Sequence, residues 1–134
     1  MSNDPKKIDV EDNKSVVMEF ISACNSKDVE KMMSFFDEDT LYHNIPMEPI
    51  VGATGIRAVL EPFLETASRV EWVVKHIAET GNQVVLTERL DRFLMKDNWL
   101  ELPVMGVFEV EGSTIRAWRD YFDLEQLRSA ARSI

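Results

Sequence analysis

The second half of the chain constrains the fold most strongly, because it contains four long strand-like segments separated by short turns. The segments are 70–78, 83–95, 100–110 and 114–122, and each turn between them carries Gly or Asn. Short turns of this composition join antiparallel strands into hairpins. We therefore expect one mostly antiparallel sheet made of consecutive hairpins.

The first half of the chain instead spaces its apolar residues as helices do. The predicted helices, including a short one that closes the chain, span 12–25, 28–36, 54–67 and 124–132. One strand is predicted at 40–45, ended by Pro46 and Pro49, because proline cannot donate to a strand ladder. Pro62 is expected to bend the third helix or to reset its first turn.

Helices followed by sequential hairpins predict an α+β fold. We expect a curved, mostly antiparallel mixed sheet with three to four helices closing a cone-shaped pocket, which is the natural place for a small ligand. A length of 134 residues fits one domain. We expect a flexible lead-in at 1–11 and a single cone domain at 12–134.

The composition argues against several classes of protein. The formal net charge is −9, whereas nucleic acids and anionic membranes require a basic surface. The one cysteine, Cys24, lies in a helical apolar pattern and is expected to be a small buried hydrophobe. No apolar run approaches the roughly 20 residues that cross a bilayer, and the polar start lacks a signal-peptide core. We therefore expect a soluble, cytoplasmic protein without membrane partners.

Polar residues at strand spacing provide the functional signal. Because residues two apart in a strand share a face, Arg89 and Asp91 are neighbours. Tyr42 and Asn44 likewise share a face, and His43 points away from them. The alternation alone does not show which face is buried.

The last strand indicates which face is inward. One of its faces is predicted to carry Thr114, Arg116, Trp118, Asp120 and Phe122. Large aromatic residues beside a carboxylate, with Phe93 on the neighbouring segment, favour an interior position. A buried carboxylate without a partner is costly, so we expect Arg89 to lie between Asp91 and Asp120.

Three segments combine into a fairly specific pattern: LYHNIP (41–46), TERLDRF (87–93) and GVFEVEGSTIRAWRDYFDL (106–124). Together with FISACNSKDVEKMMSFFDEDT (20–40), they resemble the limonene-1,2-epoxide hydrolase family. The resemblance covers most of the chain from Val16 to Leu127. It implies the fold of the nuclear-transport-factor-2-like (NTF2-like), SnoaL-like and ketosteroid-isomerase-like proteins.

The resemblance also implies roles for five side chains. The family's paired aspartates, bridged by arginine, match Asp91 as general acid, Asp120 as general base and Arg89 between them. Its water-positioning tyrosine and asparagine match Tyr42 and Asn44. The pocket is expected to be lined by Met32, Phe93, Leu102, Val104, Trp118 and Phe122. The segment MEPIVGATG (47–55) departs from the family, which leaves the substrate open.

The chemistry of epoxide opening agrees with these residues. The ring oxygen must gain a proton while the attacking water loses one, and two carboxyls in opposite protonation states do both. Arg89 with two ionised aspartates carries a net charge of −1, so one further proton neutralises the group. In a protein, one such contact at about 4 Å is worth about 4 kcal/mol. We expect one-step hydrolysis of a small cyclic or terpene-like epoxide to a vicinal diol, without a cofactor.

Two other functions remain open. A ketosteroid-isomerase-like or polyketide-cyclase-like enzyme would use a base and a donor such as Tyr42, and it would not need an arginine-bridged pair of carboxyls. A non-catalytic small-molecule-binding module is the other, because the fold alone does not fix function. His43 and His76 are the two histidines and fall on separate predicted strands, so no metal site is expected.

The outer face of the predicted sheet is the remaining feature. It is predicted to carry Trp72, Val74, Trp99, Met105 and Val107, which is more apolar than a free face needs to be. A second copy of the chain would cover it, so we expect a homodimer.

Overall fold

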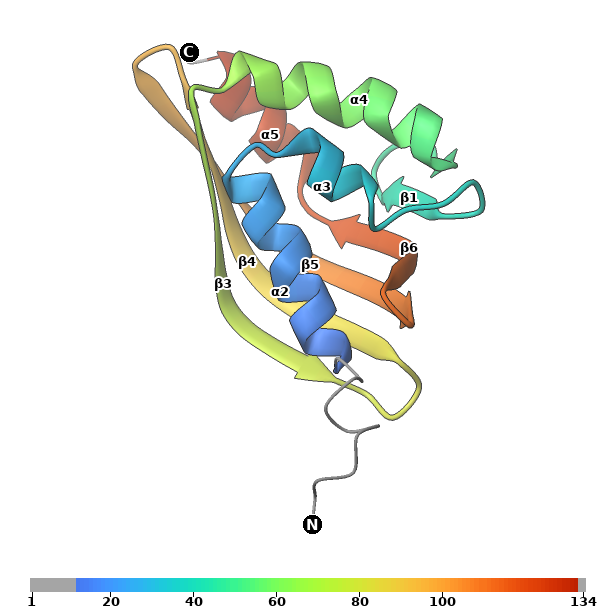
Figure 1. Ribbon diagram of the computed structural model, residues 1–134. Helices are drawn as coiled ribbons and strands as arrows, with labels where there is room; N and C mark the ends of the chain where they lie inside the picture. Colours follow the sequence, from blue (N-terminus) through green and yellow to red (C-terminus); the bar gives the residue numbers. More distant parts are fainter. Residues whose placement is uncertain (1–11, 133–134) are drawn as a thin grey trace.

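The computed structural model describes residues 12–132, and the predicted lead-in at 1–11 lies outside them. Its helices are α2 (Asn13–Asn25), α3 (Val29–Met33), α4 (Ala53–Thr66) and α5 (Leu124–Arg132). Its strands are β1 (Leu41–Asn44), β2 (Ile50–Val51), β3 (Arg69–Glu79), β4 (Val84–Met95), β5 (Asn98–Glu111) and β6 (Thr114–Tyr121). The predicted α+β order, with helices preceding sequential hairpins, is confirmed (Figure 1).

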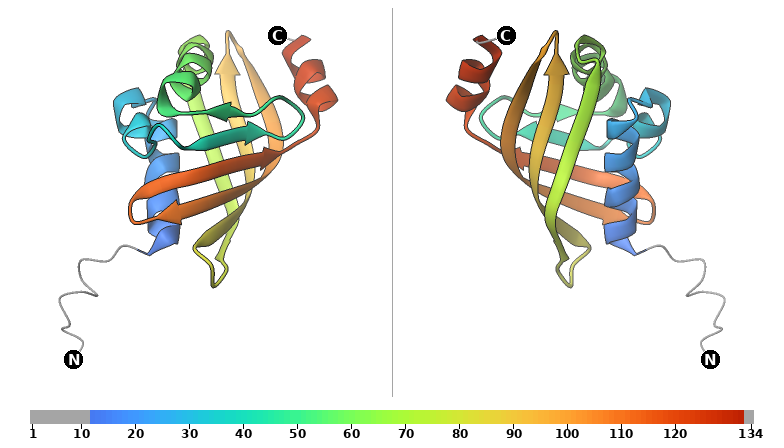
Figure 2. Two further views of the ribbon diagram at one scale, coloured as in Figure 1. Left: turned by 90° about the vertical axis from the view of Figure 1, so that its right-hand side faces the viewer. Right: turned by 90° about the vertical axis from the view of Figure 1, so that its left-hand side faces the viewer.

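The strands form one curved sheet in the order β2-β1-β6-β5-β4-β3. Neighbouring strands run antiparallel, except that β1 and β6 are parallel, so the sheet is mixed as predicted. Helix α2 packs against β3, β4 and β5, and α2, α3 and α4 lie on the concave side of the sheet (Figures 1 and 2). The sheet and helices thereby enclose the inner faces of β4, β5 and β6.

Strand β4 alternates as its sequence predicts. Its inner face carries five buried residues: Val85, Thr87, Arg89, Asp91 and Phe93. Residues opposite one another in an antiparallel pair share a face, and β5 places Gly106 opposite Thr87 and Leu102 opposite Asp91. The charged and apolar parts of the interior therefore lie along the same two strands.

Strand β6 departs from simple alternation near its start. Val110 of β5 pairs with Ile115 and Glu109 pairs with Ala117, which leaves Arg116 without an opposite residue. Such a bulge reverses the phase of the alternation. The predicted inward position of Thr114 and Arg116 is therefore wrong, because Ile115 is buried in their place. Trp118 and Asp120, beyond the bulge, are buried as predicted.

A second bulge, in β3, changes which residues of this strand lie on the outer face of the sheet. The register between β3 and β4 shifts between Val74 and His76, so that Trp72 lies opposite Asp91 and Val74 opposite Arg89. Both apolar residues consequently face the interior, where Trp72 is 7% exposed. Their predicted place on the outer face is wrong, because counting back from the hairpin turn misses the extra residue.

Two shorter features also differ from expectation. Strand β2, which pairs antiparallel with β1 at Leu41 and Tyr42, was not expected, because a two-residue strand shows no periodicity. Pro62 lies well inside α4, whose first turn begins at Ala53, so it does not reset that turn.

The core beneath the site is aromatic. Trp118 is fully buried, stacks on the ring of Tyr42 at 4.2 Å between centroids, and stacks on Phe108 at 5.7 Å. Phe20 of α2 meets the Trp118 ring edge-on at 5.0 Å. Cys24, on the same helix, is fully buried as predicted. This packing holds β1, β5 and β6 in a fixed relation below the polar residues.

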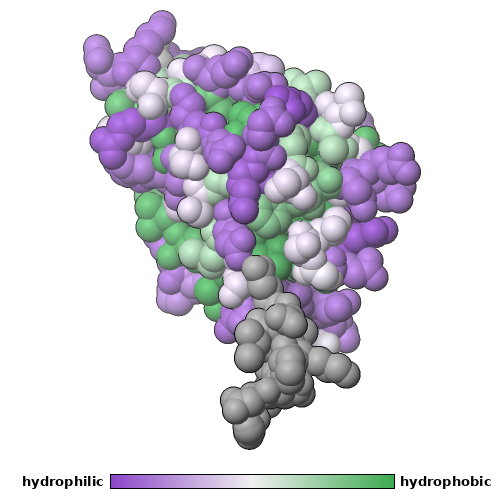
Figure 3. Space-filling model, in the orientation of Figure 1, coloured by the Kyte–Doolittle hydropathy of each residue, from purple (hydrophilic) through white to green (hydrophobic). Residues whose placement is uncertain are grey.

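The surface over the helices mixes hydrophilic and apolar residues (Figure 3). Single apolar side chains are exposed on these helices, such as Met18 on α2 and Val59 on α4. None of the helices within residues 12–132 has the length and apolar character required to span a membrane.

Candidate active site

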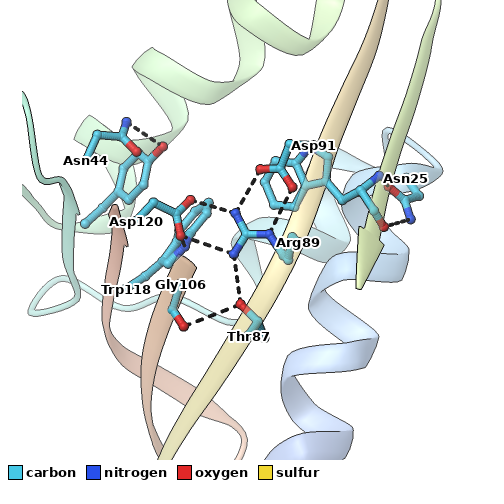
Figure 4. A network of polar contacts seen from close by, with 10 residues as sticks. Asn25, Asn44, Thr87, Arg89, Asp91, Gly106, Trp118 and Asp120 are labelled. Atoms are coloured by element: carbon cyan, nitrogen blue, oxygen red, sulfur yellow. Dashed lines mark hydrogen bonds and ion pairs between the residues drawn. The ribbon is translucent and has the colours of Figure 1, made fainter. Parts of the chain in front are cut away.

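Arg89 lies between Asp91 and Asp120 on the inner face of the sheet (Figure 4). Its Nε and Nη2 donate to Asp91 Oδ1 and Oδ2 at 3.0 and 2.8 Å. Its Nη1 and Nη2 donate to Asp120 Oδ1 and Oδ2 at 3.2 and 2.9 Å. The three side chains are 0%, 6% and 7% exposed, respectively. One guanidinium thus bridges two carboxylates almost without contact with solvent.

The strand order explains why these residues meet. Arg89 and Asp91 are two residues apart on β4, and Asp120 lies on β6, opposite Gly106 of the intervening β5. Gly106 has no side chain, so Arg89 reaches across β5 to Asp120. The bridge therefore depends on the sheet order as well as on the spacing within β4.

A fourth residue, Thr87 of β4, completes the contacts of the guanidinium. Thr87 Oγ1 accepts from Arg89 Nη1 at 3.2 Å. A guanidinium has five N–H groups, and together Asp91, Asp120 and Thr87 provide an acceptor for each of them. Thr87 was not among the predicted site residues, although its place on the same strand face as Arg89 was predicted.

Tyr42 and Asn44 come from β1, whose parallel pairing with β6 aligns them with Trp118 and Asp120. Asn44 Nδ2 donates to Tyr42 Oη at 2.9 Å. Both residues line the same cavity as Asp91 and Asp120. The structure therefore brings four of the five predicted polar residues to one cavity, and the fifth, Arg89, contacts Asp91 and Asp120 without lining it.

Burial governs the proton equilibria of this group. It raises the pKa of Asp91 to about 6, although the charge of Arg89 opposes the shift. Burial, assisted by the charge of Asp120, raises the pKa of Tyr42 well above its usual value, so the phenol keeps its proton. Burial disfavours the charge of Arg89, but the two aspartates outweigh it and raise the arginine pKa. Arg89 is therefore a permanent cation and Tyr42 a permanent donor.

Asp120 differs from Asp91 in its hydrogen bonds. It accepts two from Arg89 and a third from Trp118 Nε1, at 2.8 Å. Asp91 accepts two side-chain hydrogen bonds, both from Arg89. Additional donors stabilise the ionised form of a carboxyl. The contacts therefore favour charge on Asp120 over charge on Asp91.

The cavity beside these residues has a volume of about 270 Å³. Four of the six residues predicted to line it do so: Phe93, Leu102, Val104 and Phe122. Met32 and Trp118 are fully buried and are not among its lining residues. They belong to the packed core, where Trp118 acts on the site through its bond to Asp120.

Other walls of the cavity were not predicted. They come from Met47, Val59, Leu60, Phe63, Leu64, Trp72 and Leu127. The helical periodicity of 54–67 indicates an apolar face, but it does not indicate what that face covers. The Trp72 backbone is fixed by Asn25 of α2, whose Oδ1 accepts from Trp72 N at 2.7 Å.

The histidines lie apart from this site. His43 Nε2 bonds to the Met47 carbonyl at 2.9 Å, and exposed His76 bonds to Glu88 at 2.8 Å. Within residues 12–132, no group of three or more His, Cys, Asp and Glu side chains is placed to hold a metal ion. The two carboxyls that Arg89 bridges are groups able to donate and accept a proton.

Comparisons with known proteins agree with the geometry. A family model for the limonene-1,2-epoxide hydrolase catalytic domain matches residues 11–132. Epoxide hydrolase EphG of Mycobacterium tuberculosis is 31% identical over 106 residues, which are 78% of this chain and 69% of that protein. An LEH-like epoxide hydrolase structure from M. tuberculosis has a TM-score of 0.80 at 26% identity, covering 92% of each chain.

A structure with lower sequence identity has the same fold. A SnoaL-like protein from Shewanella denitrificans has a TM-score of 0.78 at 13% identity, covering 91% of this chain and 98% of that chain. At that identity the likeness concerns the fold alone. The predicted NTF2-like, SnoaL-like architecture is confirmed.

Proposed function

The chain belongs to the limonene-1,2-epoxide hydrolase family, and from this premise we propose that it adds water to a small apolar epoxide and releases a vicinal diol. The observation that carries the proposal is buried Arg89, which bridges Asp91 and Asp120 beside an apolar cavity. Two carboxyls that share one cation in a dry site are suited to hold one proton between them.

Asp91 is the proposed general acid. Epoxide opening needs a proton on the ring oxygen as the C–O bond breaks, and burial raises the pKa of Asp91 to about 6. Asp91 also accepts fewer hydrogen bonds than Asp120 does. The proton of the pair therefore rests on Asp91, from which it passes to the epoxide oxygen.

Asp120 is the proposed general base. Three donated hydrogen bonds favour its ionised form, and it removes a proton from the attacking water. The water oxygen bonds to an epoxide carbon in the same step in which the ring C–O bond breaks. The product is a neutral diol, and the proton gained by Asp120 balances the one lost by Asp91.

Tyr42 and Asn44 are the proposed holders of the water. Because Asn44 Nδ2 donates to Tyr42 Oη, the phenol proton remains to be donated to another acceptor. The same contact leaves Asn44 Oδ1 to accept. A water between them and Asp120 would accept from Tyr42 and donate to Asn44 and Asp120, which directs a lone pair toward the substrate.

The cavity supports a small cyclic or terpene-like epoxide as substrate. Its lining is apolar apart from Tyr42, Asn44, Asp91 and Asp120, so it offers polar contacts only at the reacting end. A volume of about 270 Å³ limits the size of the occupant. Side chains of the chain itself perform both proton transfers, so the proposed reaction needs no cofactor.

A panel of epoxides tests the proposal. We expect the protein to convert cyclohexene oxide or limonene oxide to diols, and chiral chromatography of the diols will show which carbon is attacked. Single turnover in heavy-oxygen water should label the diol and leave the protein unlabelled. No diol from any epoxide would overturn the function, and label in an aspartate would replace the one-step mechanism with a covalent one.

We further propose that the chain forms a homodimer through the outer face of the sheet. After the correction for Trp72 and Val74, that face still exposes Met105 at 50% and Tyr121 at 46%, on paired positions of β5 and β6. Light scattering should give the mass of a dimer, and Met105→Glu should give a monomer. Met18→Glu, on the exposed side of α2, is the control and should leave the dimer intact.

A further inference from the structure

Three residues on neighbouring strands lie next to Nη1 of the Arg89 guanidinium. Thr87 of β4, Gly106 of β5 and Asp120 of β6 occupy opposite positions on neighbouring strands (Figure 4). Thr87 and Asp120 each contact Arg89 Nη1, at 3.2 Å. Gly106 lies between them and has no side chain.

Position 106 requires glycine because the neighbouring side chains leave no room for a Cβ. A Cβ at this position would lie 2.3 Å from Arg89 Nη1, 2.7 Å from Asp120 Oδ1 and 2.9 Å from Thr87 Oγ1. The backbone does not require glycine, because Gly106 is not among the positive-φ residues. Glycine weakens the interior of a strand, and here its missing side chain leaves the room in which the ion pair forms.

The neighbours of Gly106 have little freedom to move aside. Asp120 Oδ1 is also held by Trp118 Nε1 at 2.8 Å. Arg89 is 1% exposed and all five of its N–H groups have acceptors. A methyl group at position 106 would therefore push Nη1 away from Asp120.

Thr87 also contacts Arg89 Nη1, the nitrogen that donates to Asp120. Its hydroxyl donates to the Gly106 carbonyl at 3.4 Å, so an oxygen lone pair remains to accept from Arg89 Nη1 at 3.2 Å. A hydroxyl has only one proton, and this donation orients it. Thr87 and Gly106 thus form a seat for one end of the guanidinium.

We propose that Thr87 and Gly106 are positioning residues that hold Arg89 across both aspartates, so that Asp91 and Asp120 take opposite protonation states. This inference rests on the proposed epoxide hydrolysis. Neither residue touches the reacting atoms, and both act through Arg89. Loss of the seat would weaken the contact of Arg89 with Asp120 and make that carboxylate easier to protonate.

Four variants test the seat, and kcat and its pH dependence are measured for each. Misplacement of a catalytic group by about 1 Å costs roughly 100-fold in rate, so Gly106→Ala should lose kcat on this scale. It should also move the acidic limb of the pH profile to higher pH. Thr87→Val, which keeps the shape and removes the hydroxyl, should do the same to a smaller extent.

Two variants are controls. Thr87→Ser keeps the hydroxyl and should restore the wild-type profile. Gly81→Ala adds a methyl group in a turn where nothing lies within 4 Å of its Cβ, and Gly81 is not among the positive-φ residues. It should leave kcat and the pH profile unchanged. Circular dichroism and thermal melting establish that each variant is folded.

The outcomes separate the seat from the proposed function. If Gly106→Ala does not fold, the comparison of Thr87→Val with Thr87→Ser decides, and equal pH profiles overturn the inference. If the wild type hydrolyses no epoxide, the proposed function is wrong. Carbon-13 NMR titration of the aspartate carboxyls then still tests whether Thr87 and Gly106 position Arg89. Identical titrations in the wild type and both seat-breaking variants would then overturn the inference.

Discussion

Two arginines three residues apart on β4, Arg89 and Arg92, each bridge two carboxylates, but one arginine is buried and the other is partly exposed. Arg89, on the inner face, bridges Asp91 and Asp120, and its Cζ lies 5.0 Å from the centroid of the Trp72 ring. Its side chain is 0% exposed. The spacing of three residues along a strand puts the second arginine, Arg92, on the opposite face.

Arg92 has the corresponding partners in a different setting. It bridges Glu71 and Glu101, and its Cζ lies 4.0 Å from the centroid of the Trp99 ring. Its side chain is 25% exposed, and those of Glu71 and Glu101 are 32% and 47% exposed. Each of the two guanidiniums therefore contacts two carboxylates and one indole ring, but the groups differ in access to water. The outer group also contains Arg69, which pairs with Glu71, and the inner group also contains Thr87 and Trp118.

The comparison indicates that burial distinguishes the carboxyl pair proposed for acid–base catalysis from an exposed ion-pair group with similar parts. Water screens the outer group, where such ion pairs contribute about 0–1 kcal/mol. In the inner group, desolvation raises the pKa of Asp91 to about 6, into the range in which a carboxyl can act as an acid near neutrality. Enzymatic function is accordingly proposed only for the inner group.

The largest expected effect is on turnover. Asp91→Asn and Asp120→Asn each remove one of the two proposed proton-transfer groups, and such a group contributes about 10²- to 10⁴-fold in rate. Glu101→Gln makes the matching change in the outer group and should leave kcat within about twofold of wild type, because Glu101 lies on the exposed face. Initial rates of diol formation measure all three.

The contrast between the groups fails if Asp91→Asn or Asp120→Asn turns over normally. It also fails if Glu101→Gln loses as much activity as they do. Circular dichroism of each variant shows that a lost rate reflects chemistry rather than unfolding.

The next effect concerns stability. Arg89→Met leaves two buried carboxylates without their cation, and breaking a buried pair costs about 3–5 kcal/mol. Arg92→Met breaks an exposed group and should cost about 0–1 kcal/mol. Denaturant unfolding measures both free energies.

Salt sharpens this comparison. High ionic strength screens exposed pairs and leaves buried ones largely unaffected. The cost of Arg92→Met should therefore shrink in concentrated salt, while the cost of Arg89→Met persists. Equal costs for the two variants at low salt would contradict the role assigned to burial.

The smallest expected effect is the dependence of stability on pH. The folded protein raises the pKa of Asp91 from 3.8 to about 6, so it binds this proton more tightly than the unfolded chain does. The stabilisation is complete below pH 3.8 and is lost as the pH rises through about 6. The unfolding free energy of wild type relative to Asp91→Asn should fall across that window.

The same titration should appear in catalysis. Because protonated Asp91 is the proposed acid, kcat should decline as the pH rises above about 6. Glu101→Gln is expected to keep the wild-type rate profile. A stability difference between wild type and Asp91→Asn that stays constant across the window would show that Asp91 carries no such proton.

The local alternation along each strand was sufficient to group the polar residues. The period of two put Thr87, Arg89 and Asp91 on one face of β4 and Tyr42 with Asn44 on one face of β1, as the structure has them. Helical spacing likewise predicted the burial of Cys24. These features depend on neighbours one to four residues away, which the sequence displays directly.

The two bulges were decided by the tertiary structure. One extra residue in β3 turns Trp72 inward to the cavity, and one in β6 buries Ile115 in place of Arg116. Alternation carries no mark of a bulge, because the extra residue is accommodated by pairing with a distant strand.

The sequence by itself determined which polar side chains share a strand face and that helices precede a sheet of hairpins. Only the tertiary structure decided that β1 runs parallel to β6, which aligns Asn44 with Asp120, and that α4 supplies a wall of the cavity. The physical reason is that a strand face is set by the local geometry of the backbone. Which face is buried, and against what, depends on packing between segments far apart in the chain.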